Sequence, residues 1–365
     1  MTTYNRIAIL GLGLIGSSIA RAVKEKKIAE HVAAFDISSQ SLDFAINQGF
    51  VDSIYLQASQ AVENADLIIF ATPPQYFSEI MEEIAKNIKP VAIITDVGSV
   101  KLSAIADITE YLPEHAQFVP AHPIAGSEKS GVEAGDANLF VGKRVILTPG
   151  KANLQSDAVK NVAKFWQLLG TKVNFMPPDM HDLVYAYVSH LPQIVAFAIT
   201  PDLSINDEIY RKFCRLHNSD AVLWADIIIA NQSFVLRSID DLSVFITQIE
   251  GELGENKQET PGSDEKTTLL FSRLIATAII ATIASLEEEL GFNPIDFVGL
   301  GFYDMTAPAF LNNPQNLLEE ISSHNQDIKQ RLSVFSEKLN KISFSIANED
   351  KDNLISLISE LKSCI

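Results

Sequence analysis

The sequence has little cysteine, a deficit of basic charge and only one long apolar run. Cys214 and Cys364 are the only cysteines among 365 residues, which excludes a disulfide framework and favours a reducing compartment such as the cytosol. Lysine and arginine total 28 against 46 aspartate and glutamate residues, a net charge of −18. Because binding to nucleic acid or to a membrane surface depends on basic patches, this balance disfavours both.

Neither membrane insertion nor secretion is expected from the apolar segments. The longest apolar run, Leu274–Leu286, contains threonine and serine and is shorter than the about 20 residues that cross a bilayer, so we expect a buried helix. The first residues, MTTYNRIAIL, lack the basic region, apolar stretch and cleavage site of a signal peptide. At about 100–200 residues per domain, the length predicts two or three domains.

The first half of the chain alternates short apolar runs with helix-like segments. The runs lie at 6–10, 32–35, 67–71, 91–95, 118–120, 144–148 and 172–175. Strands that alternate with helices in this way predict a doubly wound parallel sheet of βαβ units, a Rossmann-like fold. The remainder of the chain has a helical pattern, so we expect an all-α C-terminal part.

A glycine motif follows the first predicted strand and opens the next helix. In Gly11-Leu12-Gly13-Leu14-Ile15-Gly16, the first glycine permits a tight turn, the second lets the backbone approach a diphosphate, and the third lets helix pack on strand. The helix start offers N–H groups to the diphosphate, and Asp36 can accept hydrogen bonds from the ribose hydroxyls. No arginine follows Asp36 to bind a 2′-phosphate, so the predicted cofactor is NAD rather than NADP.

Two more segments end predicted strands at the edge where such sheets bind ligands. Thr72 and Pro73 follow the third run, and Gly98 and Ser99 follow the fourth. Ligands bind beyond the carboxyl ends of parallel strands, so these residues are candidates for contact with cofactor or substrate. Ser99 is equally a candidate N-cap of a helix over 102–111, and the two roles are compatible.

The segment 121–131, AHPIAGSEKSG, is dense in polar groups and small residues and follows the predicted strand 118–120. Histidine has an unperturbed pKa of about 6.5, so His122 can take up a proton near neutral pH. A loop of this composition at a strand end indicates a functional site, whereas a histidine without such a context is more often structural.

Several motifs together resemble the prephenate/arogenate dehydrogenase family of tyrosine biosynthesis. They are GLGLIG, Asp36, ATP at 71–73, DVGSVK at 96–101, HPIAGSEKSG at 122–131, LTP at 147–149 and HDLVYAYVSHLPQ at 181–193. The resemblance, over residues 6–245, implies NAD-dependent oxidative decarboxylation of prephenate to 4-hydroxyphenylpyruvate. It implies His122 as the base for the substrate hydroxyl and Ser99 as its orienting partner. The substrate contacts that it implies are Ser127, Glu128, His190 and Gln193.

The resemblance also implies an arginine that binds a substrate carboxylate after the SHLP motif. Arg215 takes that place, and Arg211 and Lys212 are nearby competitors. A guanidinium donates two parallel hydrogen bonds to a carboxylate, which an ammonium does not. Many family members have histidine where this chain has Gln193, which leaves the choice between prephenate and arogenate open.

No metal site is expected, because no cluster of histidine, cysteine and carboxylates has ligand spacing. Two other functions stay open. A β-hydroxyacid dehydrogenase would share the Rossmann-like half but would need a catalytic lysine in its helical part. A catalytically silent NAD-binding protein would use its helical half for interactions, and the combination of His122, Ser99 and Arg215 disfavours that reading.

We predict three domains. Residues 1–176 form the NAD-binding domain, 177–256 a helical substrate and dimerisation-type domain, and 264–365 a second helical copy. An acidic linker with proline and glycine, 250–265, leads from one helical part to the next. The last stretch, 343–365, has helix-like spacing and no strand alternation, so a ligand-binding βαββαβ module is not expected.

The prediction of a second helical copy is based on a weak internal repeat in the sequence. Ser272 echoes Ser189 at an offset of 83 residues, whereas Leu332 echoes Ile239 at an offset of 93. The change of offset requires an insertion of about ten residues, which we place in a loop such as 291–301. Two unrelated amphipathic helices can share apolar spacing, so convergence is the alternative.

The second copy lacks the predicted substrate arginine, because Ala307 falls at the place of Arg215. In the family that the chain resembles, the helical domain forms the dimer. We therefore expect the second copy to serve as an internal partner, in a pseudo-dimer with one active site for a small-molecule substrate. A monomer is favoured over a homodimer.

Overall fold

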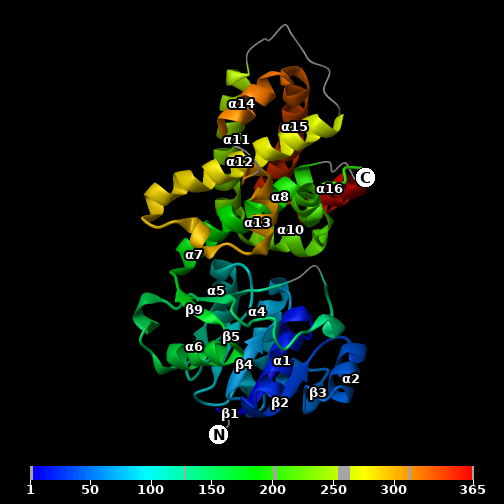
Figure 1. Ribbon diagram of the computed structural model, residues 1–365. Coiled ribbons are helices and arrows are strands. Elements are labelled where there is room, and N and C mark those ends of the chain that lie inside the picture. The colour runs from blue at the N-terminus through cyan, green and yellow to red at the C-terminus, as the bar shows by residue number, and fades with distance from the viewer. Residues whose placement is uncertain (1–2, 127–128, 200–203, 254–263, 311–313, 364–365) are drawn as a thin grey trace. The chain divides into compact units, whose positions relative to one another are not determined.

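The computed structural model describes residues 3–126, 129–199, 204–253, 264–310 and 314–363. The chain forms two compact units, Met1–Asp182 and Leu183–Ile365 (Figure 1). The strands belong to the first unit, and the second is built from helices. The division follows Asp182, whereas the predicted boundary lay at 176. The separation of the second unit into two copies stays a prediction.

The first unit is built on a six-stranded parallel sheet in the order β3-β2-β1-β4-β5-β6. The strands are β1 (Tyr4–Leu10), β2 (Ala29–Phe35), β3 (Ser53–Tyr55), β4 (Leu67–Phe70), β5 (Ile93–Asp96) and β6 (Gln117–Val119). The chain moves outward from β1 to β3 and then crosses to β4 on the other side of β1. This is the doubly wound order, so the predicted Rossmann-like fold is confirmed.

Helices cover both faces of this sheet. They are α1 (Leu14–Glu25), α2 (Ser39–Asn47), α3 (Ala58–Ala61), α4 (Phe77–Ile84), α5 (Lys101–Glu110) and α6 (Asp157–Leu169). Short 3-10 turns are η1 (Pro74–Tyr76), η2 (Ala85–Asn87), η3 (Val132–Ala134) and η4 (Lys151–Asn153). The sheet is therefore buried between two helical layers, which is why its central strand β4 is apolar and buried along its whole length.

A separate three-stranded sheet follows the parallel one. Its strands are β7 (Ala121–Ile124), β8 (Arg144–Leu147) and β9 (Lys172–Phe175), with β7 antiparallel and β9 parallel to β8. Pro120 has no N–H to donate to a ladder, and it separates β6 from β7. His122 consequently lies within β7, opposite Ile146, and not in the loop that the sequence predicted.

The second unit is helical throughout its described residues, as predicted. Its longer elements are α7 (Pro178–Tyr185, which begins in the first unit), α8 (Leu191–Ala198), α9 (Glu208–Cys214), α10 (Ala221–Ala230), α11 (Gln232–Glu252), α12 (Asp264–Leu290), α13 (Leu300–Thr306), α14 (Pro314–Ser322), α15 (Asn325–Ala347) and α16 (Lys351–Ser363). Short turns are the π-helical η5 (Ala186–His190) and the 3-10 turns η6 (Arg215–Asn218), η7 (Pro294–Phe297) and η8 (Ala307–Phe310).

The helix α12 contains the long apolar run and extends beyond it. Within the described residues, it is long and apolar enough to cross a membrane, and so is the pair α10 and α11 taken together, which bends by 96°. Length therefore does not exclude a membrane span, contrary to the sequence prediction. However, 67% of the most apolar stretch of α12 is buried inside the protein, which favours the predicted core helix.

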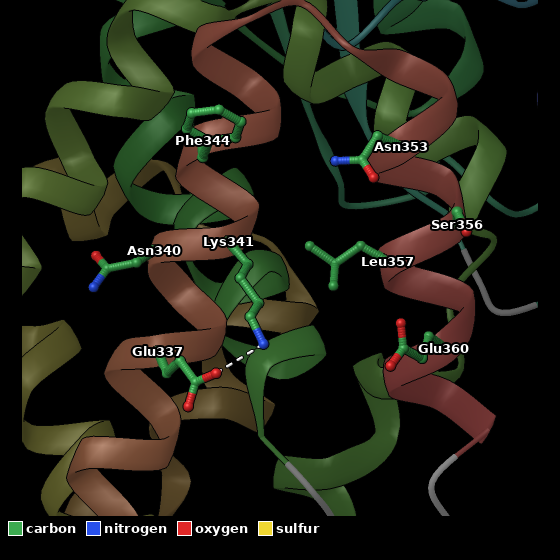
Figure 2. Close-up of a pocket in the computed structure, with 8 residues that line it drawn as sticks. All are labelled: Glu337, Asn340, Lys341, Phe344, Asn353, Ser356, Leu357 and Glu360. Carbon is green, nitrogen blue, oxygen red and sulfur yellow. Dashed lines mark ion pairs between the residues drawn. The ribbon is translucent and has the colours of Figure 1, made fainter.

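A groove of about 430 Å³ lies between α15 and α16 (Figure 2). Its lining is largely polar and includes the ion pair between Glu337 and Lys341, at 2.8 Å. Phe344, also in the lining, is one of the more exposed large apolar side chains. None of the predicted site residues lines this groove.

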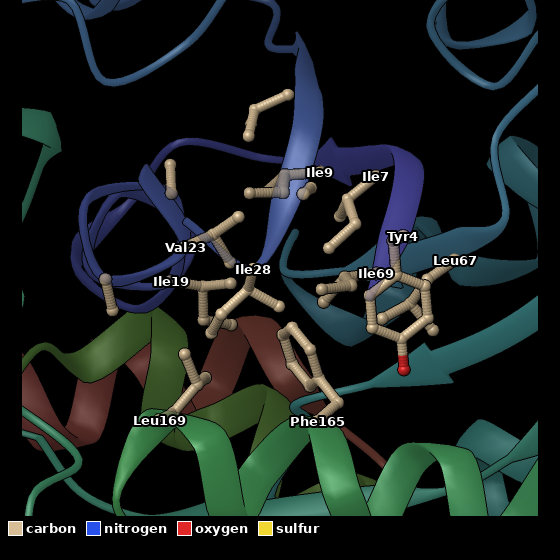
Figure 3. Close-up of a cluster of buried hydrophobic side chains, with 14 of the residues drawn as sticks. Tyr4, Ile7, Ile9, Ile19, Val23, Ile28, Leu67, Ile69, Phe165 and Leu169 are labelled. Atoms are coloured by element: carbon tan, nitrogen blue, oxygen red, sulfur yellow. The ribbon is translucent and has the colours of Figure 1, made fainter. Parts of the chain in front are cut away.

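The core of the first unit follows from the two-residue period of β1. Ile7 and Ile9 pack on one face of the sheet with Phe165 of α6, and these side chains converge in Figure 3. Ala8 and Leu10 belong to a second cluster on the opposite face, with α4 and α5. Because both faces of β1 are buried, the strand is held rigidly and the residues that follow Leu10 start from a fixed position.

Candidate active site

The carboxyl ends of β1, β4 and β5 lie in register at one edge of the parallel sheet. Leu10 pairs with Phe70, and Phe70 pairs with Asp96. The segments that follow these residues therefore meet at this edge. The structure thus brings together the predicted cofactor residues Gly11, Gly13, Leu14, Ile15, Gly16, Thr72, Pro73 and Gly98.

Two of the three glycines of the motif are required by contacts within the protein, and the third borders open space. Gly11 has φ +98°, and a Cβ there would lie 2.7 Å from the carbonyl oxygen of Ala71. A Cβ on Gly16 would lie 2.0 Å from the carbonyl oxygen of Gly11, so the start of α1 can approach β1 only without a side chain. A Cβ on Gly13 would meet nothing within 4 Å. Gly13 therefore borders open space, where a ligand can approach the backbone.

The surroundings of Gly13 fit a dinucleotide such as NAD. The helix α1 begins at Leu14 without a side-chain cap, so its first N–H groups are directed to the space beside Gly13. Asp36 lies beside this turn, because its carboxylate accepts hydrogen bonds from the backbone N–H of Leu12 (2.7 Å) and of Ser38 (2.8 Å). A carboxylate has about four lone-pair sites, so Asp36 retains acceptor capacity for ribose hydroxyls.

His122 is the end of a chain of three side chains. Its Nδ1 lies 2.9 Å from Nε2 of His181, and Nδ1 of His181 lies 2.8 Å from Oδ1 of Asp182. His181 and Asp182 are buried, whereas His122 is partly exposed. The sequence motif at 181–193 contains both residues, but the prediction gave neither of them a role. The adjacent His-Asp pair was the available signal.

The hydrogen bonds assign the ring protons of both histidines in their neutral form. A carboxylate only accepts hydrogen bonds, so His181 carries its proton on Nδ1. Nε2 of His181 is then an acceptor, and Nδ1–H of His122 donates to it. This leaves Nε2 of His122 as the basic nitrogen of the ring.

Asp182 also caps the helix α5. Its Oδ1 accepts from the backbone N–H of Lys101 and its Oδ2 from that of Leu102, each at 2.8 Å. The N-cap position is Val100, which has no side-chain hydrogen bond, so Ser99 does not cap the helix as the sequence suggested. The N-terminal end of a helix stabilises a carboxylate, so Asp182 is held as an anion beside His181.

A buried ion pair fixes the strand of His122 to the edge of the parallel sheet. Lys101 Nζ pairs with the carboxylate of Asp96 and donates to the carbonyl oxygen of Ala121 at 2.8 Å. The backbone N–H of Ala121 donates to Asp96 at 3.0 Å. Burial lowers the pKa of the Lys101 ammonium, and the charge of Asp96 opposes that change. This network positions the residue directly before His122.

Arg215 of the second unit forms an ion pair with Asp304 of α13. Nε and Nη2 of the guanidinium lie 2.7 and 2.5 Å from the same oxygen, Asp304 Oδ2. The Arg215 side chain is 33% exposed, whereas that of Asp304 is 10% exposed. Of the competitors, Lys212 forms an exposed pair with Glu208 and Arg211 is exposed.

His190 and Gln193 are buried in the second unit. The ring of His190 contacts Trp224 edge to face, and its Nδ1 lies 3.1 Å from the amide nitrogen of Asn231. Gln193 Nε2 donates to the carbonyl oxygen of Leu216 at 2.8 Å. The contact of Gln193 supports the turn η6, which begins with Arg215.

The predicted substrate residues fall into three groups. His122 and Ser99 lie in the first unit, and Arg215, His190 and Gln193 lie in the second. Ser127 and Glu128 lie outside the described residues. Among the described residues, no group of three or more histidine, cysteine and carboxylate side chains could hold a metal ion.

Family models of two consecutive domains match the chain. The prephenate dehydrogenase nucleotide-binding domain matches residues 19–175, and the prephenate dehydrogenase dimerization domain matches residues 177–261. The second match ends before α12, so the helices from α12 to α16 lie outside both models.

Curated relatives and solved structures are similar to about two thirds of the chain. A cyclohexadienyl dehydrogenase of Zymomonas mobilis is 35% identical over 271 residues, covering 70% of this chain and 92% of the relative. A prephenate dehydrogenase of Bacillus subtilis is 34% identical, covering 67% and 71%. A crystal structure of prephenate dehydrogenase from A. aeolicus, in complex with hydroxyphenyl propionate and NAD+, is 31% identical with a TM-score of 0.62 and covers 68% of this chain and 90% of that one.

Replacing Lys101 by methionine should destabilise the first unit strongly. The variant leaves the buried carboxylate of Asp96 without its cation, which costs about 3–5 kcal/mol and should lower the Tm by roughly 10 °C. Lys160→Met is the control, because Lys160 forms an exposed pair with Asp157 and its loss costs about 0–1 kcal/mol. Calorimetry measures both, and equal Tm values for the two variants would contradict the role of Lys101.

Proposed function

Because this chain belongs to the prephenate dehydrogenase family, we propose that it catalyses the NAD-dependent oxidative decarboxylation of prephenate to 4-hydroxyphenylpyruvate. The observation that carries the mechanism is the hydrogen-bonded chain Asp182–His181–His122, which leads from the start of α5 to the strand β7. An oxidation of a secondary alcohol needs a base for the hydroxyl proton, and His122 presents one.

Different residues of the first unit would bind different parts of NAD. Gly13 and the start of α1 would hold the diphosphate, and Asp36 the adenine ribose. Bound NAD supplies the acceptor for the hydride that leaves the ring carbon bearing the hydroxyl. Thr72, Pro73 and Gly98 would border the cofactor at the ends of β4 and β5.

His122 moves the proton in both halves of the reaction. Its Nε2 accepts the hydroxyl proton as the hydride leaves and the ring carbon becomes a ketone. The ring carboxylate then leaves as CO2, and the electrons of the broken C–C bond make the ring aromatic with negative charge on the former ketone oxygen. His122 returns its proton to that oxygen, so the reaction consumes no net proton.

His181 and Asp182 support His122 in both protonation states. In the neutral state they hold the ring proton of His122 on Nδ1, away from the substrate. When His122 is protonated, the anion of Asp182 stabilises the imidazolium through the polarised ring of His181. Ser99, which follows β5, would orient the hydroxyl group in the same region.

Arg215 would bind a carboxylate of the substrate. Prephenate is a dianion and the protein carries a net charge of −18, so binding depends on local cations rather than on the overall charge. Ser127, Glu128, His190 and Gln193 would contribute to the side-chain end of the substrate, directly or through neighbours.

Arogenate is the alternative substrate, and it differs from prephenate in carrying an amino acid side chain. A purified chain assayed for NADH formation with each substrate in turn distinguishes the two. Turnover with prephenate supports the proposal, and turnover with arogenate alone assigns the other substrate. Tight binding of NAD without turnover of either would favour the silent binding protein.

The proposal also covers the compartment and the oligomeric state of the enzyme. The low cysteine content and the acidic balance support a cytoplasmic protein with no nucleic acid or membrane as a partner. The working particle would be the single chain, with the C-terminal helices in place of a partner subunit.

The His122→Asn variant should lose about 10²–10⁴-fold in kcat with a modest change in KM, because asparagine cannot accept a proton. Steady-state NADH formation from prephenate measures this. His115→Asn is the control, since His115 is an exposed histidine of the same unit whose ring is hydrogen-bonded to the carbonyl oxygen of Ile88. Turnover of His122→Asn near that of the wild type would refute the assignment.

The Asp182→Asn variant should lower kcat by about 10²–10⁴-fold, although the exchanged group acts on the substrate only through the two histidines. The new amide group can donate to Nδ1 of His181, which moves the proton of that ring to Nε2 and that of His122 to its own Nε2. The base is then blocked, while the amide oxygen can still cap α5. Asp179→Asn, an exposed change in the same helix, is the control. An unchanged kcat would show that Asp182 does not act on His122 through His181.

The Arg215→Lys variant should raise KM for prephenate about 10–100-fold with a smaller effect on kcat, because lysine keeps the charge but loses the paired hydrogen bonds. Lys212→Ala should leave KM unchanged. If KM rises only in the Lys212 or an Arg211 variant, the carboxylate is bound there instead. Thermal melting of each variant identifies loss of fold.

A further inference from the structure

The helices of the second unit repeat in order and in length. The first series is α9, η6, α10 and α11, with 7, 4, 10 and 21 residues. The second series is α13, η8, α14 and α15, with 7, 4, 9 and 23 residues. Each member of the second series begins 92 or 93 residues after its counterpart. Two helical segments that share only apolar spacing have no reason to share the order of four elements, with lengths that differ by two residues at most and offsets that differ by one.

Buried side chains repeat at the same offsets. Tyr210 in α9 and Phe302 in α13, which are 92 residues apart, are both buried aromatic residues. Asn231 and His324 immediately precede α11 and α15 and are 93 residues apart, and both are buried polar residues at a helix start. The repeat therefore includes unusual positions and not only apolar ones.

The helix α12 is the counterpart of α8 at a smaller offset. Ala281 lies 83 residues after Ala198, where α8 ends, but α12 continues for nine more residues to Leu290. The segments that connect α8 to α9 and α12 to α13 have equal lengths. The inserted residues therefore form the last turns of α12, and not part of the loop 291–301 where the sequence placed them.

The two series pack as two subunits related by a two-fold axis do. The helix α8 packs against α15 of the other series, and α12 packs against α11. Similarly, α9 packs against η8, and α13 against η6. The elements α9 and α11 also contact their own counterparts, α13 and α15. In such an isologous interface every contact recurs with the partners exchanged, and elements at the axis contact their equivalents.

The two series differ in the residues at the positions of the predicted substrate contacts. Ala307 stands 92 residues after Arg215, and Ala276 stands 83 residues after Gln193. Conversely, Asp304 of the second series reaches across the interface to Arg215. Its counterpart in the first series is Lys212.

From these observations we infer that residues 264–347 are a duplicated, degenerate copy of the family's dimerisation segment, fused to the first copy as a permanent partner. The matching dimerization domain ends at residue 261, directly before this copy. The chain is therefore monomeric and holds one substrate site, to which the second copy contributes Asp304 as the positioning residue of Arg215. The role of Asp304, unlike the duplication, rests on the proposed function.

Light scattering of the full chain across a wide concentration range tests the fused partner. The expected mass is 40.1 kDa at every concentration, and the Tm should be independent of concentration because no subunits dissociate. A particle of twice that mass would overturn the inference, whether it forms through a new surface or by exchange of the C-terminal copies. Neither measurement depends on the reaction, so the duplication and the activity can fail separately.

Charge changes at the interface test the contribution of the second copy. Asp304→Asn should raise KM for prephenate about tenfold with kcat little changed, because the guanidinium loses the carboxylate that orients it. Lys212→Gln is the matched control at the symmetry-related position and should leave KM unchanged. Unaltered or lower KM in Asp304→Asn would refute the positioning role. An Asp304→Glu variant that restores KM would confirm it against a general loss of fold.

Discussion

The carboxylate of Asp182 joins three parts of the first unit that the chain keeps far apart. It caps the start of the helix α5 by accepting from two backbone N–H groups, and it holds the ring of His181, which holds the ring of His122. The anion is stable there because the start of a helix stabilises negative charge. The same interaction thus shapes the scaffold and sets which nitrogen of His122 can act as a base.

The buried pair of Lys101 and Asp96 gives this arrangement its rigidity. Asp96 ends β5 and binds the N–H of Ala121, and Lys101 begins α5 and binds the carbonyl oxygen of the same residue. A buried pair of this kind contributes little net stability over apolar packing. Its effect is positional, since a shift of β7 would break several charge-assisted hydrogen bonds at once.

The sequence predicted the features that depend on residues close together in the chain. It did not predict the contacts between residues far apart in the chain. The glycine turn, Asp36 and the alternation of strands and helices depend on neighbouring residues, so the sequence predicted the Rossmann-like fold and the edge that binds a dinucleotide. The cap of α5 comes from a residue 81 positions away, and the partner of Arg215 from one 89 positions away. The extension of α12 also escaped prediction, because its extra turns continue the helical pattern of the turns before them.

The proposed duplication of the second unit bears on how the enzyme can be regulated. Cooperative binding requires at least two sites whose occupancy is coupled within one particle. A symmetric dimer has two equivalent sites and can couple them, whereas a chain that carries its partner within itself has only one. Its saturation curve with substrate would be hyperbolic, and any feedback would have to act by competition or through a distinct effector site.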